Sequence, residues 1–425
     1  MASNLILIIL ISILVVQFVW DMGLDILNIK HWKKEVPAEL IDIVDREKYQ
    51  TSRNYQLDNF KISFWMELIS LPLTILVLSC GVLAMLDSYI RIYFENEVLI
   101  GLLFFGVIGL ASDIIKTPIE WYQTFVIEEK YGFNKMTKKL FVLDKIKGLL
   151  LSIIIGGIVL GLILLIYQKF GTGFWIWAWL LVSFLMLFFS MFYSDIIVPL
   201  FNKQTPLEEG ELRERINELA VKLGFKVKNI FVIDGSKRST KANAYFSGFG
   251  PRKRIVLYDT LIQDHTTEEL LAVLSHEIGH YKKRHVIYMT VMSLIQSAFV
   301  FFLLSVITKY PIFVEAIGVE PSVAAKGVFH IQLLVFGLLI SPMFEFIGVF
   351  GNVISRKFEY QADNYAVKAN LGEALISALK KMSVKHLSNL LPHPLYVFAN
   401  YSHPPLLERM GNIRGSDTGN KKFGE

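Results

Sequence analysis

Long apolar segments alternate with polar segments along the whole chain, and this pattern predicts its main elements. Each apolar segment is long enough to cross a hydrocarbon layer about 30 Å thick as a helix. We therefore expect an all-α polytopic membrane protein with seven transmembrane helices. The predicted spans cover residues 4–20, 64–86, 98–118, 148–167, 174–198, 286–309 and 327–350.

The first apolar segment is predicted to be a retained helix rather than a cleaved signal peptide. Residues Met1 to Asn4 contain no lysine or arginine, and no cleavage site of small residues precedes the polar turn at Asp21. A signal peptide would carry both features.

Basic residues concentrate in alternate loops, which predicts an orientation. Residues 21–63 and 119–147 are rich in lysine and arginine, whereas the intervening loops contain little beyond Arg91 and Lys169. Because basic loops remain on the cytosolic side, we expect the N-terminus outside and the C-terminus inside. Residues 199–285 would also be cytosolic.

Two segments are too polar for lipid and are expected to form a folded body on the cytosolic side. A helix is predicted over 208–223, strands over 230–233 and 255–258, and an edge strand that enters a turn over 239–250. The expected division has four parts: helices 1 to 5 (1–198), a catalytic body (199–285), helices 6 and 7 (286–350) and a C-terminal helical part (351–425).

Composition supports a membrane protein and narrows the chemistry. The chain of 425 residues is 53% hydrophobic and 19% charged, with a mean hydropathy of +0.46, which excludes disorder and an ordinary soluble protein. A net charge of +5 is too small for a protein that binds nucleic acid through its phosphates. With Cys80 as the single cysteine, a metal site would need histidines and carboxylates.

The most specific motif is His276-Glu277-Ile278-Gly279-His280. Thr266 or Thr267 would cap a helix that carries it, and the two imidazoles would share one helix face at i and i+4. This spacing lets both rings bind one zinc ion while Glu277 acts on the zinc-bound water.

A third ligand is predicted from the helix that follows the last span. Glu359 and Asp363 lie four residues apart on one face of this helix. Glu359 can complete a zinc site of two histidines and one glutamate. Asp363 would not bind the metal itself but can accept a hydrogen bond from the N–H of a zinc-binding imidazole.

Several separated motifs, in this order, resemble the integral-membrane zinc metalloproteases of the type I CAAX prenyl protease (a-factor-converting) family. They are Phe125-Val-Ile-Glu-Glu-Lys-Tyr-Gly-Phe-Asn134, Val198-Pro-Leu-Phe-Asn-Lys203, Asn243-Ala-Tyr-Phe246, the histidine motif, Glu359-x-x-x-Asp363 and Ser402-His-Pro-Pro405.

The resemblance implies a shell of seven helices around a chamber, with a zincin-like α+β catalytic body and one Zn²⁺ per chain. It also implies His276, His280 and Glu359 as zinc ligands and Glu277 as the general base. Asn243 would hold the substrate backbone, and His403 would stabilise the oxyanion. The implied activity is endoproteolysis of prenylated CAAX substrates beside the modified cysteine.

Two other functions stay open at this point. A quality-control metalloprotease with no need of a prenyl group would use the same site, and a seven-span transporter or receptor could carry the histidine motif by chance. His285 lies five residues after His280; it is interpreted as the start of the next membrane helix rather than as part of the site.

The expected partners are a peptide or protein substrate, prenylated or membrane-proximal, and membrane lipid, but no nucleic acid. No feature of the sequence indicates an oligomeric state. The C-terminal Lys421-Lys-Phe-Gly-Glu425 lacks the dilysine spacing of endoplasmic-reticulum retention. Both the bacterial inner membrane and the endoplasmic reticulum therefore stay open as locations.

Overall fold

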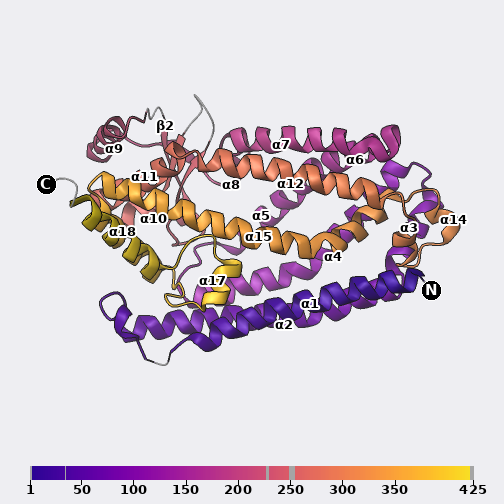
Figure 1. Cartoon of the computed structure of the whole chain (residues 1–425), viewed down its shortest axis with the longest axis horizontal. Helices are drawn as coiled ribbons and strands as arrows, with labels where there is room; N and C mark the ends of the chain where they lie inside the picture. Colours follow the sequence, from indigo (N-terminus) through magenta and orange to yellow (C-terminus); the bar gives the residue numbers. More distant parts are fainter. Residues whose placement is uncertain (1, 34, 226–228, 248–253, 422–425) are drawn as a thin grey trace.

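Long helices run side by side along the molecule, and a smaller body of helices and strands lies at one end. The computed structural model describes residues 2–33, 35–225, 229–247 and 254–421. Figure 1 shows the N-terminus at the end opposite this smaller body, where α9, β2 and α11 lie.

Six helical segments are long and apolar enough to cross a membrane within the described ranges: Ala2–His31, Arg46–Ser79, Glu97–Glu128, Lys138–Phe201, His285–Ile307 and Phe329–Lys368. The fourth contains two of the predicted spans. It consists of α5 (Lys138–Leu151), the π-helical turn Ser152–Gly156, α6 (Gly157–Phe170), α7 (Phe174–Ile196) and α8 (Val198–Phe201). Only the short turn Gly171–Gly173 separates α6 from α7.

The second predicted span, 64–86, extends beyond the end of its helix. Helix α2 runs from Arg46 to Ser79, and the chain then turns before α3 (Val82–Tyr93). Gly81 makes this turn with φ +65°, a conformation that costs glycine little. The apolar pattern continues across the turn because α3 packs in the same apolar cluster as the helix ends around it.

The other helices extend well beyond their apolar segments. Helix α1 (Ala2–His31) and α2 lie against each other along one side of the molecule (Figure 1). Helix α4 (Glu97–Tyr122) continues through the π-helical segment Gln123–Glu128, and α12 spans His285–Ile307.

Helix α15 connects the predicted last span with the polar body. It runs from Phe329 to Lys368 without interruption, about 60 Å at 1.5 Å per residue, which is roughly twice the hydrocarbon thickness. The predicted boundary at 350/351 therefore falls inside one helix. Two very short helices, α13 (Ile312–Glu315) and α14 (Pro321–Ala324), precede it.

The end opposite the polar body is filled by a continuous apolar cluster. Leu10, Leu83, Phe104, Val314 and Ile331 are buried together there, from five different elements. This packing joins the helices at that end of the bundle.

The polar body contains a four-stranded sheet in the order β1-β2-β4-β3. Strand β1 (Gln204–Pro206) pairs antiparallel with β2 (Asn229–Ile233), β2 pairs parallel with β4 (Arg254–Tyr258), and β4 pairs antiparallel with β3 (Ala244–Ser247). The predicted edge strand is thus confirmed over 244–247, while 248–250 lie outside the described residues.

The remaining helices complete the body. They are α9 (Glu211–Lys222), α10 (Asp259–Asp264), α11 (Thr267–Lys282), α16 (Gly372–Lys385), α17 (Pro394–Asn400) and α18 (Leu406–Lys421), with short 3-10 turns at Ala38–Leu40 and Gly235–Lys237. Two apolar clusters pack α11 against the sheet and α9 on one side and against α16 and α18 on the other.

Helix α11 begins where the sequence predicts. The Thr266 hydroxyl accepts a hydrogen bond from the backbone N–H of Glu269, and the Glu269 carboxylate accepts one from the N–H of Thr266. The same carboxylate accepts hydrogen bonds from Ser377 (2.6 Å) and Lys381 (2.7 Å) of α16. Glu269 therefore both caps α11 and joins it to α16.

These contacts predict an acid-sensitive contribution of Glu269 to stability. Burial alone would raise the pKa of Glu269, but the hydrogen bonds from Lys381, Ser377 and Thr266 lower it to about 2. A depressed folded-state pKa stabilises the protein above the unfolded pKa of about 4.3, and this stability is lost as the pH falls toward 2. Glu269→Gln should therefore cost about 1–3 kcal/mol at pH 7, and less as the pH falls below 4.

Thermal unfolding of detergent-purified protein between pH 7 and pH 3 measures this difference. Glu268→Gln is the matched control, because Glu268 is an exposed residue of the same turn. A Glu269→Gln deficit that stayed constant down to pH 3 would contradict the assigned ion pair.

Candidate metal centre and active site

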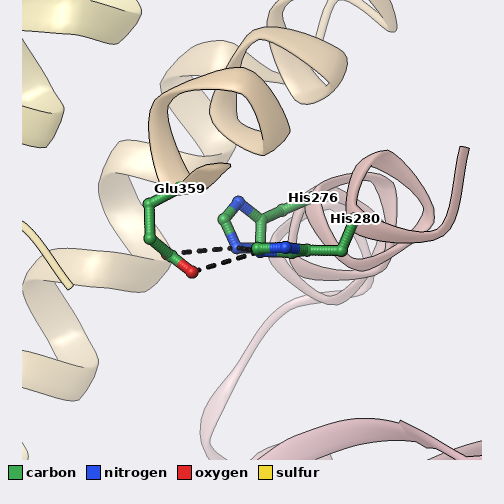
Figure 2. A group of neighbouring side chains, drawn as sticks. All are labelled: His276, His280 and Glu359. Carbon is green, nitrogen blue, oxygen red and sulfur yellow. Dashed lines mark hydrogen bonds and ion pairs between the residues drawn. The ribbon is translucent and has the colours of Figure 1, made fainter. Parts of the chain in front are cut away.

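Two helices bring three potential metal ligands together. His276 and His280 project from one face of α11, and Glu359 of α15 faces both rings from the opposite side (Figure 2). Nε2 of His276 lies 3.4 Å from Oε2 of Glu359, and Nε2 of His280 lies 3.1 Å from Oε1. The potential ligand atoms all lie within 4.8 Å of one another.

The donor set fits a metal cation. The two Nε2 atoms face each other at 3.1 Å, although two neutral imidazoles can place at most one proton between them. The buried Oε2 of Glu359 accepts no well-aligned hydrogen bond from the residues that the structure describes. Two imidazole nitrogens and a carboxylate oxygen that converge in this way match the ligands of an open His, His, Glu site.

The surrounding carboxylates also favour a cation. Burial opposes a charge on His276, but Asp363 and Glu359 outweigh it and raise the pKa of His276 to about 9. The negative charge of these two carboxylates, which stabilises the protonated form of His276, will also attract a metal ion.

Gly279 allows the two ligand helices to approach closely. A Cβ atom at this position would lie 2.9 Å from Cβ of Tyr365 and 3.0 Å from Cα of Ala362, both on α15. Only glycine therefore fits within the histidine motif at this crossing, and its absent side chain sets the separation between the histidines and Glu359.

Asp363 lies one turn after Glu359 and contacts His276, as the sequence predicts. Its Oδ1 lies 2.9 Å from Nδ1 of His276, so the Nδ1–H can donate and leave Nε2 free for a metal. Asp363 is completely buried, and such a carboxylate requires a counter-charge.

Arg409 supplies that counter-charge, and sequence reasoning missed it. This arginine of α18 is buried, forms a two-point ion pair with Asp363, and places Nη1 3.3 Å from Oε2 of Glu359. The only sequence signal was a basic residue on the helix after Ser402-His-Pro-Pro405, and nothing local indicated its partners.

A cavity of about 1570 Å³ opens in front of the three ligands. Glu277, His403 and Asn243 line it, together with the strand residues Ala244 to Phe246. Burial raises the pKa of Glu277, which helps this carboxyl group to hold a proton. All three predicted residues thus face the same space as the three potential metal ligands.

His403 lies at the edge of the cluster and Asn243 at the sheet edge. Nε2 of His403 is 3.4 Å from Oε1 of Glu359, and Nδ1 is 3.0 Å from the Ser402 hydroxyl. Asn243 immediately precedes β3 rather than lying within it, and its side-chain oxygen accepts a hydrogen bond from the N–H of Ala244.

His285 contacts the site, contrary to the interpretation favoured from the sequence. It is the first residue of α12, as that interpretation requires. However, its Nδ1 also lies 3.0 Å from Nδ1 of His280. The bend at Arg284, with φ +59°, directs the start of α12 back to the ligand helix, and sequence spacing alone does not reveal such a bend.

Two protein-family models together cover nearly the whole chain. Residues 25–203 match the CAAX prenyl protease N-terminal family with five membrane helices, and residues 206–417 match Peptidase family M48. The chain belongs to this family of membrane metalloproteases.

Individual relatives are similar to this chain over most of their length. The CAAX prenyl protease 1 homolog of Arabidopsis thaliana is 36% identical, with 96% of this chain and 97% of that protein aligned. CAAX prenyl protease 1 of Saccharomyces cerevisiae is 36% identical over 88% of both chains. The crystal structure of S. mikatae Ste24p superposes with a TM-score of 0.91 at 34% identity, covering 96% of this chain and 99% of that one.

These comparisons confirm the family resemblance and the enzyme class predicted from the motifs. A transporter or receptor with a chance histidine motif is not compatible with them, because both halves of the chain match one protease family in the expected order. The chain is an integral membrane metalloprotease with several membrane helices.

The close crossing at Gly279 predicts that Gly279→Ala will weaken both fold and metal binding. The added methyl group must push α15 away from α11, at a cost of about 1–3 kcal/mol. We expect a lower melting temperature and weaker metal binding in a chelator competition assay.

Gly348→Ala, in the exposed part of α15 where a Cβ meets nothing within 4 Å, is the control. It should equal or exceed the stability of the wild type, because alanine favours the helix. Wild-type metal affinity in Gly279→Ala would show that the crossing tolerates the methyl group.

Proposed function

We propose that this chain is a membrane-embedded zinc endopeptidase that cleaves CAAX-type prenylated or membrane-proximal peptides. The principal observation is the His276, His280 and Glu359 cluster beside Glu277, in a cavity bordered by a strand edge and by membrane helices. The substrate class is inferred from the relatives, which are CAAX prenyl proteases.

Zinc is the proposed ion, one per chain, with His276, His280 and Glu359 as its ligands. Two imidazoles and one carboxylate form a common catalytic zinc set that leaves a coordination position open. When bound, the ion supplies Lewis-acid chemistry, making a water molecule more acidic and polarising the peptide carbonyl. Asp363 fixes the tautomer of His276, and Arg409 balances the charge of Asp363.

Glu277 acts as general base and then as general acid. It faces the cavity beside the ligands, takes a proton from the attacking water and delivers it to the leaving amine. The raised pKa of this buried carboxyl group supports the second step. The net reaction adds one water molecule across the peptide bond.

His403 stabilises the developing oxyanion by donating from Nε2. A neutral imidazole that carries its proton on Nε2 leaves Nδ1 as an acceptor, and the Ser402 hydroxyl at 3.0 Å can donate to it. The Nε2 atom lies at the edge of the ligand cluster, within reach of an oxygen held there.

The substrate peptide is proposed to lie extended along β3. This strand pairs with β4 on one side, and its residues line the cavity. An extended peptide can add to such an edge through backbone hydrogen bonds, with the Asn243 amide holding it near the scissile bond.

For the membrane part we propose seven spans around a chamber, with α6 and α7 as separate crossings. A single straight helix over 138–201 would be about 96 Å long, three times the hydrocarbon thickness. Few residues of the candidate spans are buried, as expected for helices with lipid outside and a cavity inside. Substrate lipid would reach the cavity from the bilayer.

We propose the division of the chain that the sequence predicts, into residues 1–198, 199–285, 286–350 and 351–425. The zincin-like body would lie on the cytosolic side of the membrane and the N-terminus on the other side. The N-terminus lies opposite the polar body (Figure 1), which supports this orientation.

Glu277→Gln tests the catalytic assignment. Glutamine preserves the shape and the cavity but cannot take a proton, so cleavage should fall by about 10²- to 10⁴-fold. Zinc content, measured by atomic absorption, should remain one per chain. Cleavage at the wild-type rate would exclude Glu277 as the base.

A pair of peptides of equal sequence, one farnesylated at the CAAX cysteine and one unmodified, tests the substrate class. Buried prenyl carbons contribute about 0.8 kcal/mol each, so kcat/KM should favour the farnesylated peptide at least tenfold. Cleavage is measured with purified wild type in detergent. Equal rates for both peptides would favour the quality-control function instead.

A further inference from the structure

His280 has a second ring nitrogen whose partner the proposed mechanism does not explain. Its Nε2 atom faces Glu359 and the Nε2 atom of His276. Its Nδ1 atom points the other way and lies 3.0 Å from Nδ1 of His285. The bond between these two histidines is therefore directly behind the metal cluster.

The hydrogen-bond network assigns one tautomer to each ring. A metal-binding Nε2 atom of His280 must be unprotonated, so the proton of that ring is on Nδ1 and is donated to His285. His285 then accepts at Nδ1 and carries its own proton on Nε2. That Nε2 atom lies 3.0 Å from the side-chain oxygen of Gln361, which can only accept.

The opposite assignment fails at both ends. If His285 donated from Nδ1, then His280 would carry its proton on Nε2, where it would block a metal. A neutral His285 would also present an unprotonated Nε2 to the Gln361 oxygen, placing two acceptors 3.0 Å apart. Each contact pairs one donor with one acceptor only when His280 donates to His285 and His285 donates to Gln361.

Packing holds the His285 ring in this orientation. The side chain is buried, with 3% of its surface exposed, and it stacks on Phe358 with 4.0 Å between ring centroids and 7° between planes. Phe358 and Gln361 both belong to α15, on either side of Glu359.

The two metal-ligand histidines thus receive parallel support from α15. His276 donates directly to Asp363, whereas His280 reaches Gln361 through His285. Asp363 is an anion and Gln361 a neutral amide. The hydrogen bond to Asp363 should therefore increase the basicity of His276 more than the relay to Gln361 increases that of His280.

We propose that His285 is a positioning residue that, together with Gln361, fixes the tautomer and ring orientation of His280 for metal binding. The inference depends on the proposed metal site, and it adds a residue outside the predicted ligand set. His285 also lines the cavity, and in the proposed role it acts through His280.

Two substitutions of similar polarity separate this role from simple packing. In His285→Asn the amide oxygen can occupy the place of Nδ1 and accept from His280. In His285→Gln the longer amide reaches the place of Nε2 and offers no acceptor to His280. Both variants lose the stacking on Phe358 equally.

Zinc affinity is measured by competition with a chromophoric chelator, on full-length protein purified in detergent. We expect His285→Gln to bind zinc about 10- to 100-fold more weakly than the wild type, and His285→Asn to recover most of this loss. The visible spectrum of the Co²⁺-loaded protein should shift in His285→Gln and return toward the wild type in His285→Asn. The melting temperature of the metal-free proteins checks folding.

Gln361→Leu provides an independent measurement, because this side chain is exposed and its replacement should leave the fold intact. It should weaken zinc binding in the same direction as His285→Gln but by less, since His285 remains.

Three results would overturn the inference: His285→Gln with wild-type zinc affinity and cobalt spectrum, equal losses in the Asn and Gln variants, or Gln361→Leu with no loss of affinity. Failure of the proposed function is distinguishable, because it requires a wild-type protein that holds no zinc or cleaves neither peptide.

Discussion

The candidate active site depends on one helix crossing, between α11 and α15. Helix α11 carries two imidazoles and α15 carries the carboxylate, and these come from segments far apart in the sequence. Gly279 permits the crossing because any side chain there would overlap α15. The relative position of three ligands thus follows from a missing side chain, together with the packing of α11 against the sheet and α16.

The same crossing brings together the charges that support the site. Asp363 and Glu359 are both buried, and two buried carboxylates without compensation would be costly. Arg409 from α18 contacts both, and its charge compensates Asp363 more closely than Glu359. Glu359 therefore remains available to a cation, while Asp363 is committed to Arg409 and His276.

The polar body also contacts the membrane helices at a distance from the three potential metal ligands. Lys241, just before β3, forms an ion pair with Glu128 at the end of the π-helical segment that continues α4, and it donates to the Tyr55 hydroxyl of α2. Residues around Asn134 pair with the backbone near Ser239. These contacts explain why the motif over 125–134 accompanies the motif at Asn243: both fix the position of the strand edge that borders the cavity.

The sequence alone determined the features that depend on local spacing. Apolar length predicts membrane helices, a capping box predicts the start of α11, and i to i+4 spacing places His276 with His280 and Glu359 with Asp363 on shared faces. Tertiary structure decided where the chain turns and which distant groups meet. Gly81 divides an apolar segment that the hydrophobic pattern predicts to be one span. Helix α15 continues through the predicted boundary at 350/351, because a change in polarity along the sequence does not by itself end a helix. Arg409 and His285 reach the site only through the packing of α18 and the bend at Arg284. Their sequence neighbours carry no sign of this, since a buried ion pair or a histidine relay is specified by partners that lie far away along the chain.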